Sequence, residues 1–350
     1  MLMRRVAVGI AVALAMTLAA VVFPVATYAA GAPEVDEVSL ELADTSAPGH
    51  VLVRAGDRFK EMVEERSDGE IEVVRYSHGE LYDARGLIEA VEIGSVAMGI
   101  QHMAFVGGHS PALEFISAVG AQGLWEDVDH YHRFIDQPEV REIAAEEFES
   151  KLNQKLLAMW DYGAGIYAAR SEEYFVRDLD GYAGARMRTA GTAMAELYRN
   201  LGVSPADLDI GEVYMALERG TIDSFSTGPS RVYLDGMYEV APYITQDGTL
   251  PRLVFWVTMN LDTWNELTPE HQEIIQETAT ELESFTREEA TSDIDDFHAS
   301  LEEVAEVYYF TDEQIAEVRS VAEPALKALF TDRVGEEMAT RLFDLMEQAR

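Results

Sequence analysis

Strands and helices are predicted to alternate through the first part of the chain. Apolar residues at every second position are typical of strands, and apolar residues three or four positions apart are typical of helices. The elements predicted in this way are a strand at 38–43, a helix at 49–66, a strand at 70–76, a helix near 84–93 and a strand at 96–100. Because strands that alternate with helices form parallel sheets covered on both faces, we expect an α/β fold with a doubly wound sheet.

The remainder of the chain adds more strands and one very long helix. Strands are predicted at 155–162, 165–169, 185–189 and 250–260, and a helix that opens near residue 126 is predicted to run to about 152. Thr268 and Pro269 are typical of a helix start, and the apolar stripe after them continues for roughly thirty-five residues without a break. A helix of that length can brace two domains. A strand at 307–310 and a final amphipathic helix, opened by a capping box of Thr311 and Gln314, are predicted to follow.

The length and the first residues suggest a secreted protein of two domains. A chain of 350 residues is long for one core and natural for two. Residues 1–30 have the pattern of a cleaved signal peptide, because Arg4 and Arg5 precede an apolar stretch at 6–25 and small residues follow. A retained membrane anchor is the alternative, since that stretch is long enough to span a bilayer. The break at Pro24 favours cleavage, and we expect a periplasmic protein.

Acidic residues greatly outnumber basic ones. The chain has 64 Asp and Glu against 26 Lys and Arg, and only four of the basic residues are lysine. Loss of residues 1–30 would change the formal net charge from −38 to about −40. Such a surface suits molar salt, where the Debye length is about 3 Å and self-repulsion is screened. We expect neither nucleic acid nor anionic lipid to be a partner.

Several kinds of chemistry have no matching motif. The chain has no cysteine, which excludes disulfides, thiolate catalysis and zinc–thiolate sites, and it has no glycine-rich phosphate loop, GxSxG or HExxH motif. His130 and His132 lie beside acidic residues and suggest a metal site, but the same residues are typical of a helix start. We expect no cofactor and no metal. A hydrolase with paired carboxylates is the enzymatic alternative, because 64 acids supply pairs at any spacing.

The stretch 181–229 holds the residue on which the functional interpretation depends. Arg188 lies in the predicted strand at 185–189, and a guanidinium at a buried strand end needs an anion. That anion is either a protein carboxylate or a ligand.

This stretch resembles the solute-binding proteins of TRAP (tripartite ATP-independent periplasmic) transporters, the DctP-like family. The matching residues are Arg186-Met187-Arg188, Leu201-Gly202-Val203, Glu212-Val213-Tyr214, Ala216-Leu217, Gly220, Ile222 and Asp223. The segments 49–69, 87–98 and 260–267 are also similar to the family, so the resemblance covers about residues 38–310. It implies a non-enzymatic, periplasmic protein that delivers its ligand to TRAP membrane permease subunits. A sensor that docks on a signalling receptor is the alternative, because it would share the fold and the pocket.

The resemblance also implies an architecture. We expect a two-lobed periplasmic binding protein-like α/β fold, in which each lobe is a sheet flanked by helices and a long C-terminal helix braces both lobes. The expected parts are 36–160 with 250–267 as lobe I, 161–249 as lobe II, 268–306 as the bracing helix, and 307–350 as a C-terminal strand and helices.

The candidate binding residues lie at strand ends, because open α/β sheets bind ligands at the carboxyl ends of their strands. The predicted ligand-binding residues are Arg188, Gln101, His102, Tyr167, Phe225, Ser226, Thr227, Trp256 and Trp125. Arg188 is predicted to pair with a carboxylate, the polar residues to bind other ligand oxygens, and the aromatic residues to form walls. As alternatives, His102 is an ordinary loop residue, and Phe255 and Trp256 belong to the core.

The number of arginines suggests the ligand class. The family has a second carboxylate-binding arginine where this chain has Ala164 and Gly165, and Arg170 or Arg186 is the alternative source of that contact. With Arg188 alone, a second carboxylate would face a strongly acidic protein. We therefore expect the ligand to be a monocarboxylate or a zwitterion, such as a 2-oxo acid, a hydroxy acid or ectoine, in preference to succinate, malate or fumarate. Separately, we expect the protein to be a monomer.

Overall fold

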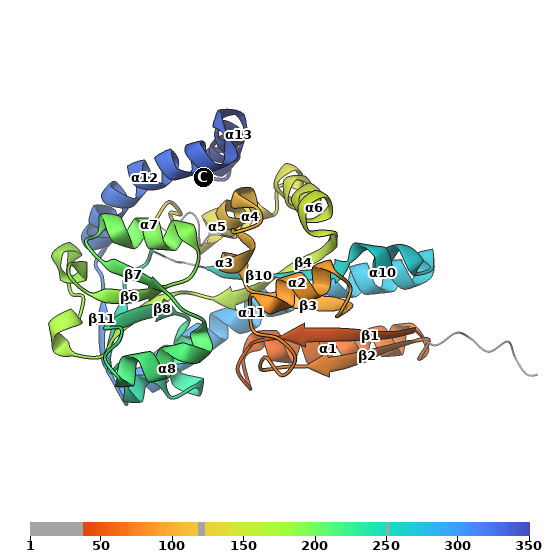
Figure 1. The fold of residues 1–350 in the computed structure, drawn as a ribbon, viewed down its shortest axis with the longest axis horizontal. Coiled ribbons are helices and arrows are strands. Elements are labelled where there is room, and N and C mark those ends of the chain that lie inside the picture. The colour runs from red at the N-terminus through yellow and green to blue at the C-terminus, as the bar shows by residue number, and fades with distance from the viewer. Residues whose placement is uncertain (1–37, 118–122, 250–251) are drawn as a thin grey trace, which may run out of the picture. The chain divides into compact units, whose positions relative to one another are not determined.

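The computed structural model describes residues 38–117, 123–249 and 252–350 (Figure 1). The predicted signal peptide at 1–30 lies outside the described residues, as does the start of the strand predicted at 250–260. The described chain contains two β-sheets flanked by helices, which confirms the two-lobed α/β fold. We call the sheet that contains the first strand, with its helices, lobe I, and the other sheet with its helices lobe II.

Lobe I is built on a five-stranded sheet with the order β2-β1-β3-β10-β4. Its strands are β1 Val38–Asp44, β2 Ile71–Tyr76, β3 Met98–Gln101, β4 Gln154–Gly163 and β10 Leu253–Asn260. β1 is parallel to β2 and to β3, as predicted, but β10 is antiparallel to both β3 and β4. The parallel pairing predicted from the first three strands is therefore confirmed, and β10, whose direction was not predicted, is antiparallel because it follows the strands of lobe II along the chain and enters lobe I from the opposite direction.

Five of the seven described helices of lobe I begin at a residue whose side chain accepts from a backbone N–H of the first turn, the exceptions being α2 and α6. They are α1 Val51–Arg66, α2 Gly86–Glu92, α3 Met103–Val106, α4 Pro111–Ile116, α5 Val128–Ile135, α6 Pro138–Leu152 and α10 Leu261–Glu266. The single helix predicted to run to about residue 152 is two helices, since α5 ends at Ile135 and α6 starts at Pro138. Proline has no backbone N–H and fits the first helical turn, so it begins a new helix there.

Lobe II is built on a six-stranded sheet with the order β11-β9-β5-β8-β6-β7. Its strands are β5 Ile166–Ala169, β6 Arg186–Thr189, β7 Ser204–Asp207, β8 Ser224–Thr227, β9 Tyr243–Gln246 and β11 Glu306–Tyr309, and its helices are α7 Thr192–Asn200, α8 Ile210–Glu218 and α9 Pro229–Leu234. Short 3-10 turns occupy Glu172–Tyr174, Leu179–Tyr182 and Met237–Glu239. The last strand, β11, comes from the C-terminal part of the chain and pairs in parallel with β9.

The long helix α11, Pro269–Glu302, contacts both lobes (Figure 1). It packs on α1 and β4 of lobe I and on α9 and β11 of lobe II. Its start has the predicted cap, since the Thr268 side chain accepts from the backbone N–H of His271 and Pro269 follows. The indole Nε1 of Trp160 donates to the carbonyl oxygen of Ala279, which fixes the helix against β4. The prediction of a bracing helix is confirmed.

Two further helices follow β11. α12, Asp312–Val334, begins at the predicted capping box of Thr311 and Gln314, and α13, Glu336–Gln348, packs against it. α12 also contacts α7 of lobe II and α4 of lobe I, so it is a second element that joins the lobes. Among the helices of the described residues, none has both the length and the apolar character required to cross a membrane.

Candidate functional site

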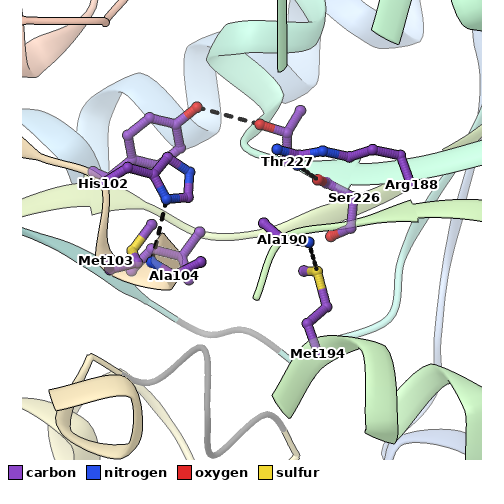
Figure 2. Close-up of a pocket in the computed structure, with 10 residues that line it drawn as sticks. His102, Met103, Ala104, Arg188, Ala190, Met194, Ser226 and Thr227 are labelled. Atoms are coloured by element: carbon purple, nitrogen blue, oxygen red, sulfur yellow. Dashed lines mark hydrogen bonds between the residues drawn. The ribbon is translucent and has the colours of Figure 1, made fainter. Parts of the chain in front are cut away.

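A buried cavity lies between the two lobes, at the ends of several strands (Figure 2). It has two compartments that share His102, Tyr162 and Thr227. The Arg188 compartment is lined in addition by Met103, Ala104, Arg188, Ala190, Met194, Ser226 and Leu253. The Arg231 compartment is lined in addition by Thr45, Ser46, Ile210, Arg231 and Phe255. Figure 2 shows Arg188, Ser226 and Thr227 on one side of the cavity and His102, Met103 and Ala104 on the other.

The cavity is narrow. The Arg188 compartment has a volume of about 30 Å³ and the Arg231 compartment about 20 Å³. Since one water needs about 10–15 Å³ by this measure, the Arg188 compartment has room for only about two or three waters and the Arg231 compartment for about one or two. An organic molecule can therefore enter only when the lobes move apart.

Arg188 is a buried cation in the cavity wall. Its side chain comes from β6, and the residue is 2% exposed. Its Nε donates to the carbonyl oxygen of Leu208 at 3.0 Å and its Nη1 to that of Ser226 at 3.4 Å, whereas Nη2 has no hydrogen-bond partner. Burial lowers the pKa of Arg188 to about 10, so it stays charged at neutral pH. No carboxylate of the described residues forms an ion pair with it, which leaves its charge for a ligand to compensate.

His102 lies directly after β3 and caps α3. Its Nδ1 accepts a hydrogen bond from the backbone N–H of Ala104 at 3.2 Å. The ring centroid is 4.8 Å from that of Phe105 and 5.0 Å from that of Phe255. Burial and the positive charges of Arg188, Arg231 and Arg85 lower the pKa of His102 to about 3, so its ring is neutral at physiological pH.

Arg231, in the first turns of α9, is a second guanidinium at the cavity that the sequence reasoning missed. Its Nη1 donates to the carbonyl oxygen of Thr45 in lobe I at 2.9 Å, and its Nε lies 2.6 Å from a carboxylate oxygen of Asp235. Its position in the chain could have indicated this role, because Arg231 follows the carboxyl end of β8 by four residues, in the first turn after Gly228 and Pro229. Unlike Arg188, Arg231 has a carboxylate partner on its own helix.

Tyr162, at the end of β4, is another cavity residue absent from the predicted set. Its ring stacks on Phe255 at 5.1 Å and lies 4.3 Å from the His50 ring. Its hydroxyl is 3.5 Å from Oγ1 of Thr227, which belongs to lobe II. Burial raises the pKa of Tyr162, so the hydroxyl keeps its proton and can both donate and accept.

Four of the nine predicted binding residues line the cavity, namely Arg188, His102, Ser226 and Thr227. Gln101, Tyr167 and Phe225 do not. Gln101 Nε2 donates to Gln154 Oε1 at 2.9 Å, Tyr167 donates to the carbonyl oxygen of Tyr174, and Phe225 is part of the lobe II core. Neighbouring residues of a strand point to opposite faces, so Phe225 lies away from the cavity that its neighbour Ser226 lines.

The two predicted tryptophans are also core residues in this structure. Trp125 packs among Phe115, Tyr131 and Phe134, and Trp256 packs against Phe148. On β10 the residues that reach the cavity are Leu253 and Phe255, which lie on the face of the strand opposite to Trp256. The core alternative therefore describes Trp256 correctly, whereas Phe255 is a wall.

Arg170 and Arg186, the alternative sources of a second carboxylate contact, both bind Asp223. Nε of Arg170 lies 3.0 Å from Oδ1 of Asp223, and Arg186 contacts both carboxylate oxygens, at 2.9 and 2.8 Å. Although burial would raise it, these hydrogen bonds lower the pKa of Asp223 to about 2. Neither arginine lines the cavity, and the group of three residues joins β5, β6 and the turn before β8.

The histidine pair that suggested a metal has other partners. His130 Nδ1 accepts from the backbone N–H of Glu126, and His132 Nε2 lies 3.0 Å from Asp161 Oδ2. Within the ranges that the structure describes, no group of three or more His, Asp or Glu residues is placed to hold a metal ion.

Residues 42–333 match the family model described as bacterial extracellular solute-binding protein, family 7. The C4-dicarboxylate-binding periplasmic protein DctP of Rhodobacter capsulatus is 25% identical over 240 residues, which are 66% of this chain and 68% of that protein. The ectoine-binding periplasmic protein TeaA of Halomonas elongata is 26% identical over 290 residues, 80% of each chain.

The fold is similar to that of solved TRAP periplasmic solute-binding proteins. The protein of this type from Desulfovibrio salexigens, solved with bound orotic acid, superimposes with a TM-score of 0.82. That match has 20% sequence identity and covers 89% of this chain and 99% of the other. At this identity the likeness concerns the fold.

Proposed function

Because this chain belongs to the family 7 bacterial extracellular solute-binding proteins, we propose that it captures a small organic carboxylate between its lobes and delivers it to a TRAP membrane permease. Members of this family are binding proteins rather than enzymes. The relatives from Rhodobacter and Halomonas are named as periplasmic, which supports a periplasmic location for this chain after removal of a signal peptide at residues 1–30.

The unpartnered Nη2 of Arg188 is the observation that carries this proposal. A buried polar group without a hydrogen-bond partner is rare in folded proteins and costs roughly 1–3 kcal/mol, more when it is charged. Here the unpartnered atom belongs to a cavity wall rather than to a packed core. A ligand carboxylate is the planar anion that a guanidinium binds best, since two parallel hydrogen bonds can form.

Ligand binding would be coupled to closure of the lobes. The cavity takes Arg188, Ser226 and Thr227 from lobe II and His102 and Tyr162 from lobe I. A ligand that contacts both sets stabilises the closed arrangement by its differential affinity for it. The cross-lobe bonds from Arg231 to Thr45 and between Tyr162 and Thr227 support the same arrangement. The closed form would then dock on the permease.

The charges at the cavity favour a monocarboxylate over a dicarboxylate. Arg231 forms an ion pair with Asp235, whereas Arg188 has only carbonyl hydrogen-bond partners and feels the charges of Asp209 and Asp207 without contact, so one guanidinium without an ion-pair partner among the described residues faces the cavity. One ligand carboxylate balances that charge. The second carboxylate of succinate would have to compete with Asp235 for Arg231. The relatives' names include both a dicarboxylate and ectoine, so family membership alone does not decide between these ligand types.

The test is the Arg188→Ala variant, with Arg219→Ala as the control that removes an exposed arginine of the same lobe. Calorimetric titration in molar NaCl with pyruvate, lactate and succinate measures the affinity. We expect Arg188→Ala to weaken binding of the preferred acid by about 2–5 kcal/mol, the usual cost of stranding one partner of a buried charge pair, and Arg219→Ala to leave it unchanged.

Two results would count against the proposal. Equal affinity of the wild type and Arg188→Ala for a verified ligand would remove Arg188 from the site. Failure of the wild type to bind any carboxylate from a wide screen in molar salt would remove the function itself.

A further inference from the structure

The cavity is lined by two arginines, a histidine and several hydroxyl groups, and among its described lining residues there is no Asp or Glu. Two of its residues are arginines, and the nearby backbone acceptors are already in use. The carbonyl oxygens of Leu208 and Ser226 accept from Arg188, and that of Thr45 accepts from Arg231. A positively charged ligand group would therefore meet two guanidinium groups and, among the described lining residues, no carboxylate to balance its charge.

His102 extends this donor character into the middle of the cavity. Its Nδ1 accepts from the Ala104 N–H, so the proton of the neutral ring is on Nε2. Nε2 has no hydrogen-bond partner among the residues that the structure describes. Phe105 and Phe255 hold the ring from two sides, and burial together with the nearby arginines keeps the pKa of His102 at about 3. The ring thus presents one fixed donor and cannot become an acceptor without breaking the cap of α3.

His102 is placed to contact the ligand next to the carboxylate. It lines both compartments, and it faces Arg188 across the cavity (Figure 2). After burial, the charge of Arg188 is the largest influence on the imidazole, which agrees with a short separation between the two groups. A carboxylate bound by Arg188 therefore has its adjacent carbon on the His102 side.

We infer that His102 Nε2–H binds an oxygen on the carbon next to the ligand carboxylate, and that the cavity accepts 2-oxo and 2-hydroxy monocarboxylates but rejects amino acids and other zwitterions. This inference rests on the proposed function and narrows the ligand class that the sequence predicted. A keto or hydroxyl oxygen accepts from His102, whereas an ammonium group has only hydrogens to offer and adds a third positive charge beside two arginines. A site built around a hydrogen bond of this kind discriminates strongly against ligands that cannot make it.

The experiment uses ligands that differ only at the carbon next to the carboxylate. Pyruvate, lactate, L-alanine and propionate form a three-carbon series, and 2-oxopentanoate, 2-hydroxypentanoate, norvaline and pentanoate form a five-carbon series. Each is titrated into the mature protein in molar NaCl. In the series that binds, we expect the 2-oxo or 2-hydroxy acid to bind at least about 10-fold tighter than the unsubstituted acid and about 100-fold tighter than the amino acid.

His102→Asn separates ligand recognition from folding. Its side-chain oxygen can still accept from the Ala104 N–H, so the melting temperature should stay close to that of the wild type. Its amide N–H groups lie nearer the backbone than Nε2, so no donor remains at the position of Nε2. We expect the preference of this variant for the 2-oxo acid over the unsubstituted acid to fall to nearly one. An unchanged preference, or an amino acid that binds as tightly as the hydroxy acid while still depending on Arg188, would overturn the inference and leave the proposed function intact. If the wild type bound none of the tested carboxylate ligands, the proposed function itself would instead be refuted.

Discussion

A single buried carboxylate, that of Glu114, contacts both lobes and α12. Removal of its charged partner should lower the stability of the protein by a measurable amount. Glu114 of α4 is fully buried. Its Oε1 accepts from the backbone N–H of Ala193 in α7 at 2.9 Å, and its Oε2 pairs with Arg333 of α12. Arg333 also donates to the carbonyl oxygen of Gly107 at 2.9 Å. The backbone before α7 lies close to that of α3 here, since a Cβ added at Gly191 would lie 2.7 Å from the carbonyl oxygen of Ala104.

Arg333→Ala would leave the Glu114 charge buried, with the Ala193 N–H as the one hydrogen-bond partner of its side chain that remains among the described residues. Removal of one partner of a buried ion pair costs about 3–5 kcal/mol. For a chain of this length the unfolding entropy is roughly 0.7 kcal/mol per kelvin, so the expected fall in melting temperature is about 4–7 °C. The double variant Glu114→Gln with Arg333→Ala strands no charge and should recover much of that loss.

Thermal melting followed by circular dichroism in molar NaCl measures these differences. Lys327→Ala is the matched control, because Lys327 lies on the same helix and pairs with Glu323 at an exposed site. It should change the stability by less than about 1 kcal/mol, as is usual for surface pairs. A fall in melting temperature of under 1 °C for Arg333→Ala, or a double variant no more stable than the single one, would show that the Glu114–Arg333 pair does not stabilise the contact of α4 with α7 and α12.

Two further expectations concern charge. Melting temperature should rise with NaCl into the molar range, because screening relieves repulsion in a chain with 64 acidic and 26 basic residues; a steady fall with salt would contradict this. The free energy of unfolding should fall as the pH falls from about 6.5 toward 3. Burial, together with the charges of Arg231 and Arg54, lowers the pKa of His50 to about 3 in the folded protein. Between these two pH values the His50 side chain therefore binds a proton in the unfolded state only, which favours unfolding. His50→Asn, which can still accept from the Leu52 N–H, should flatten this slope, and an unchanged slope would exclude His50 as its source.

Local sequence signals predicted the elements of this fold well, because each depends on neighbours in the chain. The capping residues Thr268 and Thr311 and the spacing of apolar positions located α11 and α12. Strand direction depends instead on how the chain returns between lobes. Nothing within β10 itself distinguishes its antiparallel pairing with β3 and β4 from a parallel one.

The same distinction applies to the candidate site. Arg188 was predicted because a guanidinium at a buried strand end needs an anion and because the stretch around it resembles the family. Arg231 and Tyr162 were missed because their roles depend on contacts across the lobes, to Thr45 and Thr227. Phe225 and Trp256 were chosen on strands that reach the cavity but on the wrong face, and a shift of one position along a strand reverses the face.

The strong negative charge of the whole protein does not prevent the cavity from binding an anion, because interactions depend on distance and on screening. In molar salt, surface acids more than about 3 Å from the cavity are largely screened, whereas groups within it are not. The described lining residues include Arg188 and Arg231 but no acid, and the acid next to Arg231, Asp235, belongs to its own helix. The ligand's charge should therefore be set by these few buried groups rather than by the net charge of the chain. A surface charge reversal far from the cavity should accordingly alter stability and solubility before it alters which acid is bound.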